Sequence, residues 1–371
     1  MKRLLALLLA VVLSVSLAAC SVQAVPNPDG KKPPRTVTDV WGREVALPER
    51  VEKIICLGSG APRIAAYLNV TDLLVGAEEH DRKEETVLRD YQPVHYETLK
   101  SLPMVGSGGG SGSNNGYPEE IIKAAPDVIL AGFSQESADE LAAQTGIPVV
   151  SVRYTSRGLA NDTFYDAMRV FAQVVGAEER CETVLSFIDS CKADLKDRTA
   201  GIAEDAKKTA YTGAVTFSGR HGFAGTYAQF GPFDAIGAIN VADEVKEDGY
   251  FEADLEKVLD WDPDVIFLDP GNLNLVEEEL AANPGYFGAV RAIREGQVYG
   301  MPSFNHCGMN ISYALLDAYY AGTVLFPEQF SDVDMAEKGG EILTFFLGED
   351  TFEKMADGGL TFGVIDLGFT Q

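Results

Sequence analysis

Short apolar runs alternate with helical patterns along the first half of the chain. Residues 51–57 form an apolar run typical of a buried strand, and a glycine turn separates it from a helical pattern at 62–68. Helix and strand follow one another in 119–131, and a helical pattern at 137–145 precedes a strand-like run at 148–152. This alternation predicts parallel βαβ units.

The second half repeats part of this pattern. The tetrapeptide Pro-Asp-Val-Ile begins at Pro126 and again at Pro263, each time between a predicted helix and a predicted strand. A four-residue match is weak by itself, but the shared context indicates two related α/β lobes. We expect each lobe to carry its own core.

A long helical pattern lies between the two halves. Apolar side chains recur at a spacing of three and four residues, and no Pro or Gly interrupts 178–198. At 1.5 Å per residue the helix would be roughly 30 Å long, enough to connect two lobes, although it could also be an amphipathic helix of one lobe. The predicted fold is α/β, with two Rossmann-like lobes joined by a single long interlobe helix.

The N-terminus has the pattern of a secretory signal. Lys2 and Arg3 precede an apolar run, which ends in small residues before Cys20. The apolar stretch is shorter than the roughly 20 residues of a membrane span. The residues Leu-Ala-Ala-Cys ending at Cys20 resemble a bacterial lipobox, which implies a lipid on Cys20; an ordinary exported protein is the alternative. A Pro-rich polar stretch follows and would serve as a tether.

These patterns divide the chain into five predicted segments. They are a signal peptide at 1–19, a lipid-anchored tether at 20–36, an N-terminal lobe at 37–177, an interlobe helix at 178–204 and a C-terminal lobe at 205–371.

Composition and charge narrow the function. The 371 residues carry a net charge of −26, which argues against nucleic-acid binding because that requires a basic face. The sequence has neither a Gly-x-Ser-x-Gly nor a His-Glu-x-x-His motif, so we expect no enzyme. Cys181 and Cys191 would lie roughly 15 Å apart on one helix, too far for a disulfide. We expect buried thiols rather than a disulfide framework.

At this point the sequence resembles the substrate-binding lipoproteins of ABC importers, in the class for iron-siderophore complexes, haem and cobalamin. The resemblance rests on Cys20 with its lipobox, the opening segments 36–48 and 50–55, both Pro-Asp-Val-Ile phrases, and the segments 237–242 and 296–299. It implies two α/β lobes that move little on binding, a ligand in the cleft between them, and an ABC permease with its ATPase as partner.

Two features depart from that family. Many members carry an acidic residue after the first strand that docks on the permease, whereas this chain has Ser59-Gly-Ala-Pro-Arg63 there. The Gly-rich segment 106–117 is also longer than expected. It could present amide groups to an anion or be a flexible linker.

Loops after strands are where α/β lobes bind ligands, because strand ends and helix N-termini present free backbone groups there. Arg63 and Arg220 could pair with an anion, or Arg63 could cap its own helix. His221 could donate a hydrogen bond or bind a metal, and Tyr117 could stack on a macrocycle or pack in the core. His306 and Cys307 could bind a metal only with help from elsewhere. The candidate ligand-binding residues are Ser59, Arg63, Tyr117, Arg220, His221, Tyr227, Asn305, His306 and Asn310.

The leading hypothesis is a non-enzymatic, extracytoplasmic and monomeric receptor, anchored to the membrane through Cys20. It would capture an iron complex, haem or a corrinoid as its small-molecule ligand and need no cofactor of its own. The first alternative is capture of a bare ion such as zinc or manganese, which convergence of His80, His221 and His306 would favour. The second is a secreted metalloenzyme or chelatase on the same scaffold.

Overall fold

The computed structural model describes residues 35–109, 114–154, 158–245 and 249–369, which belong to one compact unit. The predicted signal peptide, the lipidation site Cys20 and the predicted tether up to residue 34 lie outside the described residues, whereas residues 35 and 36, predicted as tether, belong to the first strand. Among the described residues no helix combines the length and the apolar character that crossing a membrane requires.

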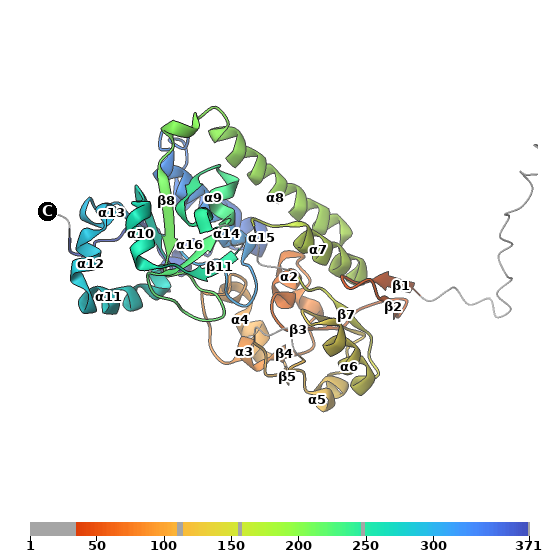
Figure 1. The fold of residues 1–371 in the computed structure, drawn as a ribbon. Helices are drawn as coiled ribbons and strands as arrows, with labels where there is room; N and C mark the ends of the chain where they lie inside the picture. Colours follow the sequence, from red (N-terminus) through yellow and green to blue (C-terminus); the bar gives the residue numbers. More distant parts are fainter. Residues whose placement is uncertain (1–34, 110–113, 155–157, 246–248, 370–371) are drawn as a thin grey trace, which may run out of the picture. The chain divides into compact units, whose positions relative to one another are not determined.

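The N-terminal half contains two small parallel sheets and the helices that connect their strands (Figure 1). In chain order the elements are β1 (Arg35–Thr38), β2 (Glu44–Leu47), β3 (Ile54–Leu57), α2 (Ala61–Tyr67), η1 (Thr71–Leu73), β4 (Ala77–Glu78), α3 (Glu79–Arg82), α4 (Gln92–Ser101), β5 (Met104–Gly106), α5 (Pro118–Ala124), β6 (Val128–Ala131), α6 (Gln135–Thr145), β7 (Val149–Ser151), α7 (Asp162–Val175) and α8 (Glu178–Thr199).

The C-terminal half contains a larger sheet with helices packed on it. Its elements are η2 (Glu204–Ala206), β8 (Thr209–Gly213), β9 (Gly225–Ala228), α9 (Gly231–Ala235), β10 (Ile239–Asn240), η3 (Val241–Val245), β11 (Gly249–Glu252), α10 (Leu255–Trp261), β12 (Val265–Leu268), η4 (Pro270–Asn272), α11 (Leu273–Ala282), α12 (Pro284–Ala289), α13 (Arg291–Arg294), β13 (Val298–Gly300), α14 (Ile311–Leu325), α15 (Met335–Leu347), α16 (Phe352–Asp357) and β14 (Gly363–Val364).

The predicted parallel sheets are confirmed. The N-terminal sheet has the order β3-β6-β7, all parallel, and β4 pairs in parallel with β5. The C-terminal sheet has the order β10-β8-β12-β13-β14, in which only β14 runs antiparallel. Both Pro-Asp-Val-Ile phrases lead into a central strand, β6 and β12, as their context predicted. The α/β fold with two lobes is therefore the observed fold.

The strands of the β3-β6-β7 sheet and the central strand β12 are buried on both faces, as strands of parallel sheets are. In β3, Ile54 and Cys56 face one core, whereas Ile55 and Leu57 face another. The second core includes side chains of α5 and α6. A further core lies between the C-terminal sheet and α10 to α13. The largest core is shared: it runs from one face of the N-terminal sheet through α7, α8, α14 and α15 to one face of the C-terminal sheet. The expectation of a separate core in each lobe is thus only partly right.

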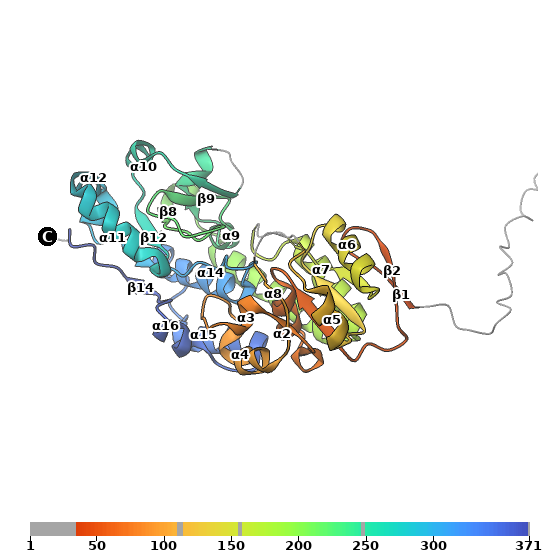
Figure 2. The same cartoon turned by 90° about the horizontal axis from the view of Figure 1, so that it is seen from below.

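The helix predicted at 178–198 is α8. It packs against α7 on one side and against α9 and α14 on the other (Figures 1 and 2). A second helix also makes contacts between the two halves, because α15 packs against α2. That α8 alone joins the lobes therefore stays a prediction.

Helix α14 is buried on nearly all sides and carries a carboxyl group without a partner. Asp317 is fully buried, and neither carboxylate oxygen has a hydrogen-bond partner among the described residues. Burial, with the nearby charge of Asp269, holds the pKa of Asp317 well above its ordinary value. Above a pH of about 3.9 the unfolded chain loses the proton that the folded chain keeps, so this group lowers stability as pH rises.

We therefore expect Asp317→Asn to be more stable than the wild type at pH 7. The free energy of unfolding should rise by more than about 1.4 kcal/mol, the equivalent of one pKa unit, and the gain should shrink toward pH 4. Urea denaturation at both pH values measures this, with the exposed Asp197→Asn as control. A variant no more stable than the wild type at pH 7 would contradict the expectation.

Candidate functional site

A tight turn before α14 brings two candidate residues toward the N-terminal half. Asn305 and Met309 form an isolated antiparallel bridge, and Cys307 and Gly308 at the tip have φ of 52° and 85°. A side chain at Gly308 would meet Arg63 Nη1 and the Tyr154 hydroxyl at 3.1 and 3.2 Å. Cysteine is uncommon at positive φ, so the turn holds Cys307 in a strained backbone geometry that often marks functional sites.

His80 lies opposite this turn. It sits in α3, directly after β4, and its backbone N–H donates to the Ser107 carbonyl at 3.2 Å. A side chain at Gly108 would come within 2.6 Å of the His80 Cβ, so glycine is needed for the two loops to approach. The position of His80 is therefore set by the β4 and β5 loops of the N-terminal half.

His80, His306 and Cys307 form a cluster of metal-ligating groups. Their donor atoms all lie within 4.8 Å of one another, and His80 Nε2 is 2.9 Å from Cys307 Sγ. The two imidazole rings stack with centroids 6.3 Å apart. Imidazole and thiolate are ligands that zinc, copper and nickel accept, and three such groups leave a coordination position open.

The surroundings keep both imidazoles neutral at pH 7. Burial, followed by the charge of Arg89, lowers the pKa of His80, and burial with Arg89, His80 and Arg63 lowers that of His306 to about 4. Burial raises the pKa of the Cys307 thiol, which Arg89 opposes through its charge and a hydrogen bond. Neutral imidazole is the form that binds metal, so both rings are ready to coordinate.

Arg89 faces Asp81, the neighbour of His80 in α3, and its charge acts on all three donors. Its side chain is 2% exposed, and its Nε is 3.7 Å from the Asp81 carboxylate, too far for a hydrogen bond. Nε and Nη1 have no hydrogen-bond partner among the described residues. Buried guanidinium groups are almost always paired, so these two nitrogens are unusual.

Arg63, which the sequence suggested as an anion partner, is instead committed within the protein. It is fully buried and forms an ion pair with Asp90 at 2.8 Å. It also donates to the carbonyls of His306 and Cys307, to Asn310 Oδ1 and to the Tyr154 hydroxyl. These five bonds use all five of its donors. Arg63 thus fastens the turn to α2, and its burial keeps it away from any docking surface.

Asn310 also holds the turn before α14 against the N-terminal half. Its Oδ1 also accepts from the Asp90 backbone N–H, and its Nδ2 donates to the Leu88 carbonyl, at 3.1 and 3.0 Å. The Tyr67 hydroxyl and the Ser312 hydroxyl donate to the other oxygen of Asp90. Asn310 is therefore a positioning residue of the turn rather than a free ligand contact.

Asn305 links the turn to a cluster of aromatic residues. Its Nδ2 donates to the Tyr227 hydroxyl at 2.9 Å. The ring centroid of Tyr227 lies 6.0 Å from that of Phe217, which stacks on Tyr250 at 5.1 Å. His221 Nδ1 lies 2.6 Å from the Tyr250 hydroxyl and 2.9 Å from Glu252 Oε1. The aromatic cluster, defined as Phe217, His221, Tyr227 and Tyr250, thus neighbours the turn.

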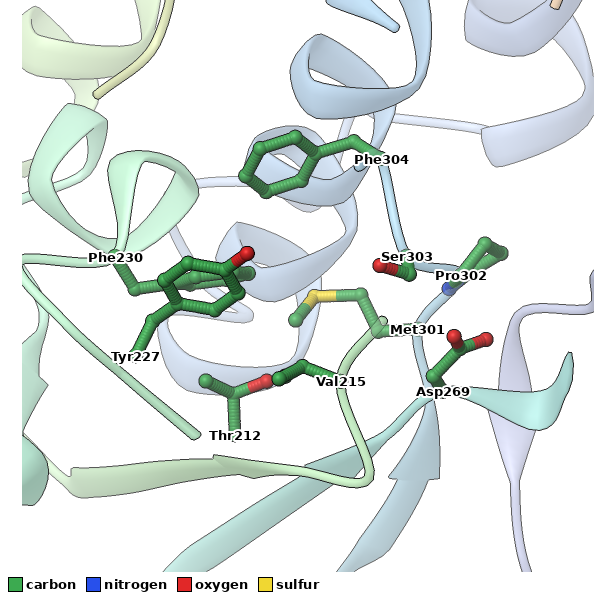
Figure 3. A pocket seen from close by; sticks show the side chains of 9 residues that line it. All are labelled: Thr212, Val215, Tyr227, Phe230, Asp269, Met301, Pro302, Ser303 and Phe304. Carbon is green, nitrogen blue, oxygen red and sulfur yellow. The ribbon is translucent and has the colours of Figure 1, made fainter. Parts of the chain in front are cut away.

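Tyr227 also lines a small pocket in the C-terminal half (Figure 3). Its space of about 10 Å³ holds roughly one water molecule, so the pocket cannot take a chelate. Its lining residues are Thr212, Val215, Tyr227, Phe230, Asp269, Met301, Pro302, Ser303 and Phe304.

The remaining predicted site residues, Arg220, Tyr117 and Ser59, contribute no donor to the cluster of His80, His306 and Cys307. Arg220 is held by the Asn272 side chain and the Gly271 carbonyl at 2.7 and 2.6 Å. Tyr117 is 37% exposed at the start of α5, and no contact to the donors involves it. Ser59 Oγ donates to the Gly109 carbonyl at 3.5 Å. Part of the Gly-rich segment, 110–113, lies outside the described residues.

The match to known families covers most of this architecture. The family model described as "Periplasmic binding protein" matches residues 54–304, which include the β3-β6-β7 sheet and the C-terminal sheet apart from β14. The chain belongs to the periplasmic binding protein family. As a periplasmic binding protein it is extracytoplasmic. The resemblance found in the sequence is thereby confirmed.

Several periplasmic binding proteins are similar to this one. The molybdate-binding protein MolA of Haemophilus influenzae is 23% identical over 81% of this chain and 87% of its own. A periplasmic solute binding protein of Veillonella parvula has a TM-score of 0.67 and 17% sequence identity. The superposition covers 88% of this chain and 96% of that one. CeuE of Helicobacter pylori with Ni(II) bound has a TM-score of 0.61 and 18% sequence identity. The superposition covers 85% of this chain and 96% of that one.

The role of Arg89 was not predicted from the sequence. His80 was considered together with His221 and His306; the structure brings His80 and His306 together and places His221 in the aromatic cluster. Arg89 lies in an irregular segment without a motif. One sequence signal could have pointed to His80 and His306. Both follow predicted or observed strands, and loops after strands meet at one edge of the sheet in this fold.

Proposed function

We propose that this periplasmic binding protein captures a metal complex and delivers it to its ABC permease. The observation that carries the proposal is the donor cluster of His80, His306 and Cys307, which draws ligands from both halves of the chain. The adjacent aromatic cluster supports a cargo with a flat or unsaturated organic part, because aromatic rings pack on such groups. An iron-siderophore complex, haem or a corrinoid fits both features.

A second candidate is a bare transition-metal ion. The donor atoms are close enough together to surround a single ion. Thiolate with imidazole favours zinc, nickel or copper over manganese, which prefers oxygen ligands. The molybdate bound by MolA adds an oxyanion of a metal as a third cargo to be tried.

The test is a binding panel with the soluble chain that begins after Cys20. The protein is mixed separately with haem, cobalamin, a ferric siderophore, NiCl₂, ZnCl₂ and sodium molybdate, then gel-filtered and analysed for metal. We expect near one-to-one retention of one metal complex. Retention of zinc or nickel alone would favour the second candidate, and retention of none would reject a metal cargo.

The lipid anchor is part of the same proposal. The lipobox-like residues before Cys20 support it, and a lipid there would hold the receptor at the membrane that contains the permease. We expect the mature wild type to fractionate with membranes and Cys20→Ala to be released from them.

A further inference from the structure

Two nitrogens of Arg89, Nε and Nη1, have no hydrogen-bond partner among the described residues, and they bear on which chemical groups the cargo carries. Among the described residues, Arg89 is nearly fully buried, faces Asp81 next to His80, and has two nitrogens without a hydrogen-bond partner. Leaving buried donors unsatisfied is costly, so a site with two of them favours a ligand that supplies acceptors.

The hydrogen bonds of Asn310 that hold the turn before α14 also fix the position of Arg89. The backbone on both sides of it bonds Asn310: the Leu88 carbonyl accepts from Asn310, and the Asp90 N–H donates to it. Asp81 faces Arg89, but its Oδ1 already accepts from the Tyr91 hydroxyl at 2.7 Å. The guanidinium is therefore held beside the donors with part of its binding capacity unused.

The charge of Arg89 also bears on the metal itself. A bare divalent cation at His80, His306 and Cys307 would experience the positive charge of Arg89, which the Asp81 carboxylate 3.7 Å away opposes, and like charges repel. A metal that brings negatively charged oxygen ligands avoids this repulsion. A guanidinium is well matched to such oxygens because it donates in a planar fork.

We propose that Arg89 binds an anionic oxygen of the cargo, so that the metal reaches the donor cluster as an anionic oxygen complex rather than as an aqua cation. The oxygen could belong to a carboxylate of an organic chelator or to an oxyanion of the metal, which share this chemistry. The inference rests on the proposed metal cargo and narrows its class.

Isothermal titration calorimetry of the chain lacking residues 1–20 tests this with three probes: NiCl₂ in a non-chelating buffer, Ni²⁺ with excess citrate, and sodium molybdate. We expect the wild type to bind Ni²⁺-citrate or molybdate more tightly than aqua Ni²⁺, and the responding probe identifies the oxygen source. Arg89→Gln should weaken that binding by about 10–100-fold, the range for a charged hydrogen bond, without weakening binding of aqua Ni²⁺.

Two further variants separate binding from folding. The double variant Arg89→Gln/Asp81→Asn leaves no carboxylate without its countercharge. The variant Arg89→Lys keeps the positive charge but not the planar set of guanidinium donors. Each should unfold cooperatively and show the same selective loss, smaller for lysine. Equal loss for all three probes, no loss for any, or tighter wild-type binding of aqua Ni²⁺ would overturn the role of Arg89 while leaving a metal cargo intact. If the wild type retains no metal from the binding panel or from these probes, the proposed function fails and this inference with it.

Discussion

Replacing Arg63 with alanine is expected to lower the free energy of unfolding by about 3–5 kcal/mol, the usual cost of removing one partner of a buried ion pair. Arg63 and Asp90 are both fully buried, and the substitution would leave the Asp90 carboxylate without its countercharge. It would also leave the carbonyls of His306 and Cys307 without this donor. Denaturant unfolding monitored by circular dichroism measures the change.

The matched control is Arg50→Ala, because Arg50 pairs with Glu52 at the surface, where their side chains are 83% and 59% exposed. Its loss should cost less than about 1 kcal/mol. Arg63→Lys is the milder variant should the alanine protein not fold, since it keeps the charge but not the five bonds. Similar costs for Arg63→Ala and Arg50→Ala would show that the connection through Arg63 contributes little to stability.

Arg63 also shows the limit of reading a site from the sequence. Its place after the strand predicted at 51–57, which is β3, was correctly inferred, and that place in this fold suggests a ligand contact. The sequence could not show that Asp90, Tyr154 and the turn before α14 converge on it. Local patterns fix strands and helices, whereas the partner of a buried charge depends on contacts between residues far apart in the chain.

Removal of the His306 side chain should have the largest effect on binding. We expect His306→Ala and His80→Ala each to weaken the affinity for the retained metal cargo by more than the roughly 10–100-fold that loss of an outer-shell partner costs, because each removes a ligand itself. Titration calorimetry with the cargo identified by the binding panel measures the change.

His95→Gln serves as the control, because His95 lies in α4 and is not part of the donor cluster. It should bind like the wild type. If the two alanine variants also bind like the wild type, the cargo is held elsewhere, and the aromatic cluster around Tyr250 becomes the site to examine. A loss in His306→Ala but not in His80→Ala would restrict the ligands to the turn before α14.

The fold was largely predictable because it follows from periodicity. The strands at β3, β6, β7 and β12 and the long helix α8 all lie within the predicted ranges. The donor set was only half predictable. His306 and Cys307 were candidates that required a third ligand, and the residue that joins them, His80, lies more than 200 positions earlier in the sequence. Its proximity depends on how the β4 and β5 loops pack, which no local pattern encodes.

The core shared by the two sheets has a mechanical consequence. Helices α8, α14 and α15 belong to that core, so the two halves cannot swing apart without exposing apolar side chains to water. We therefore expect the empty and loaded receptors to have nearly the same outline. A permease that recognises the loaded form would then sense it through small rearrangements at the site rather than through a hinge.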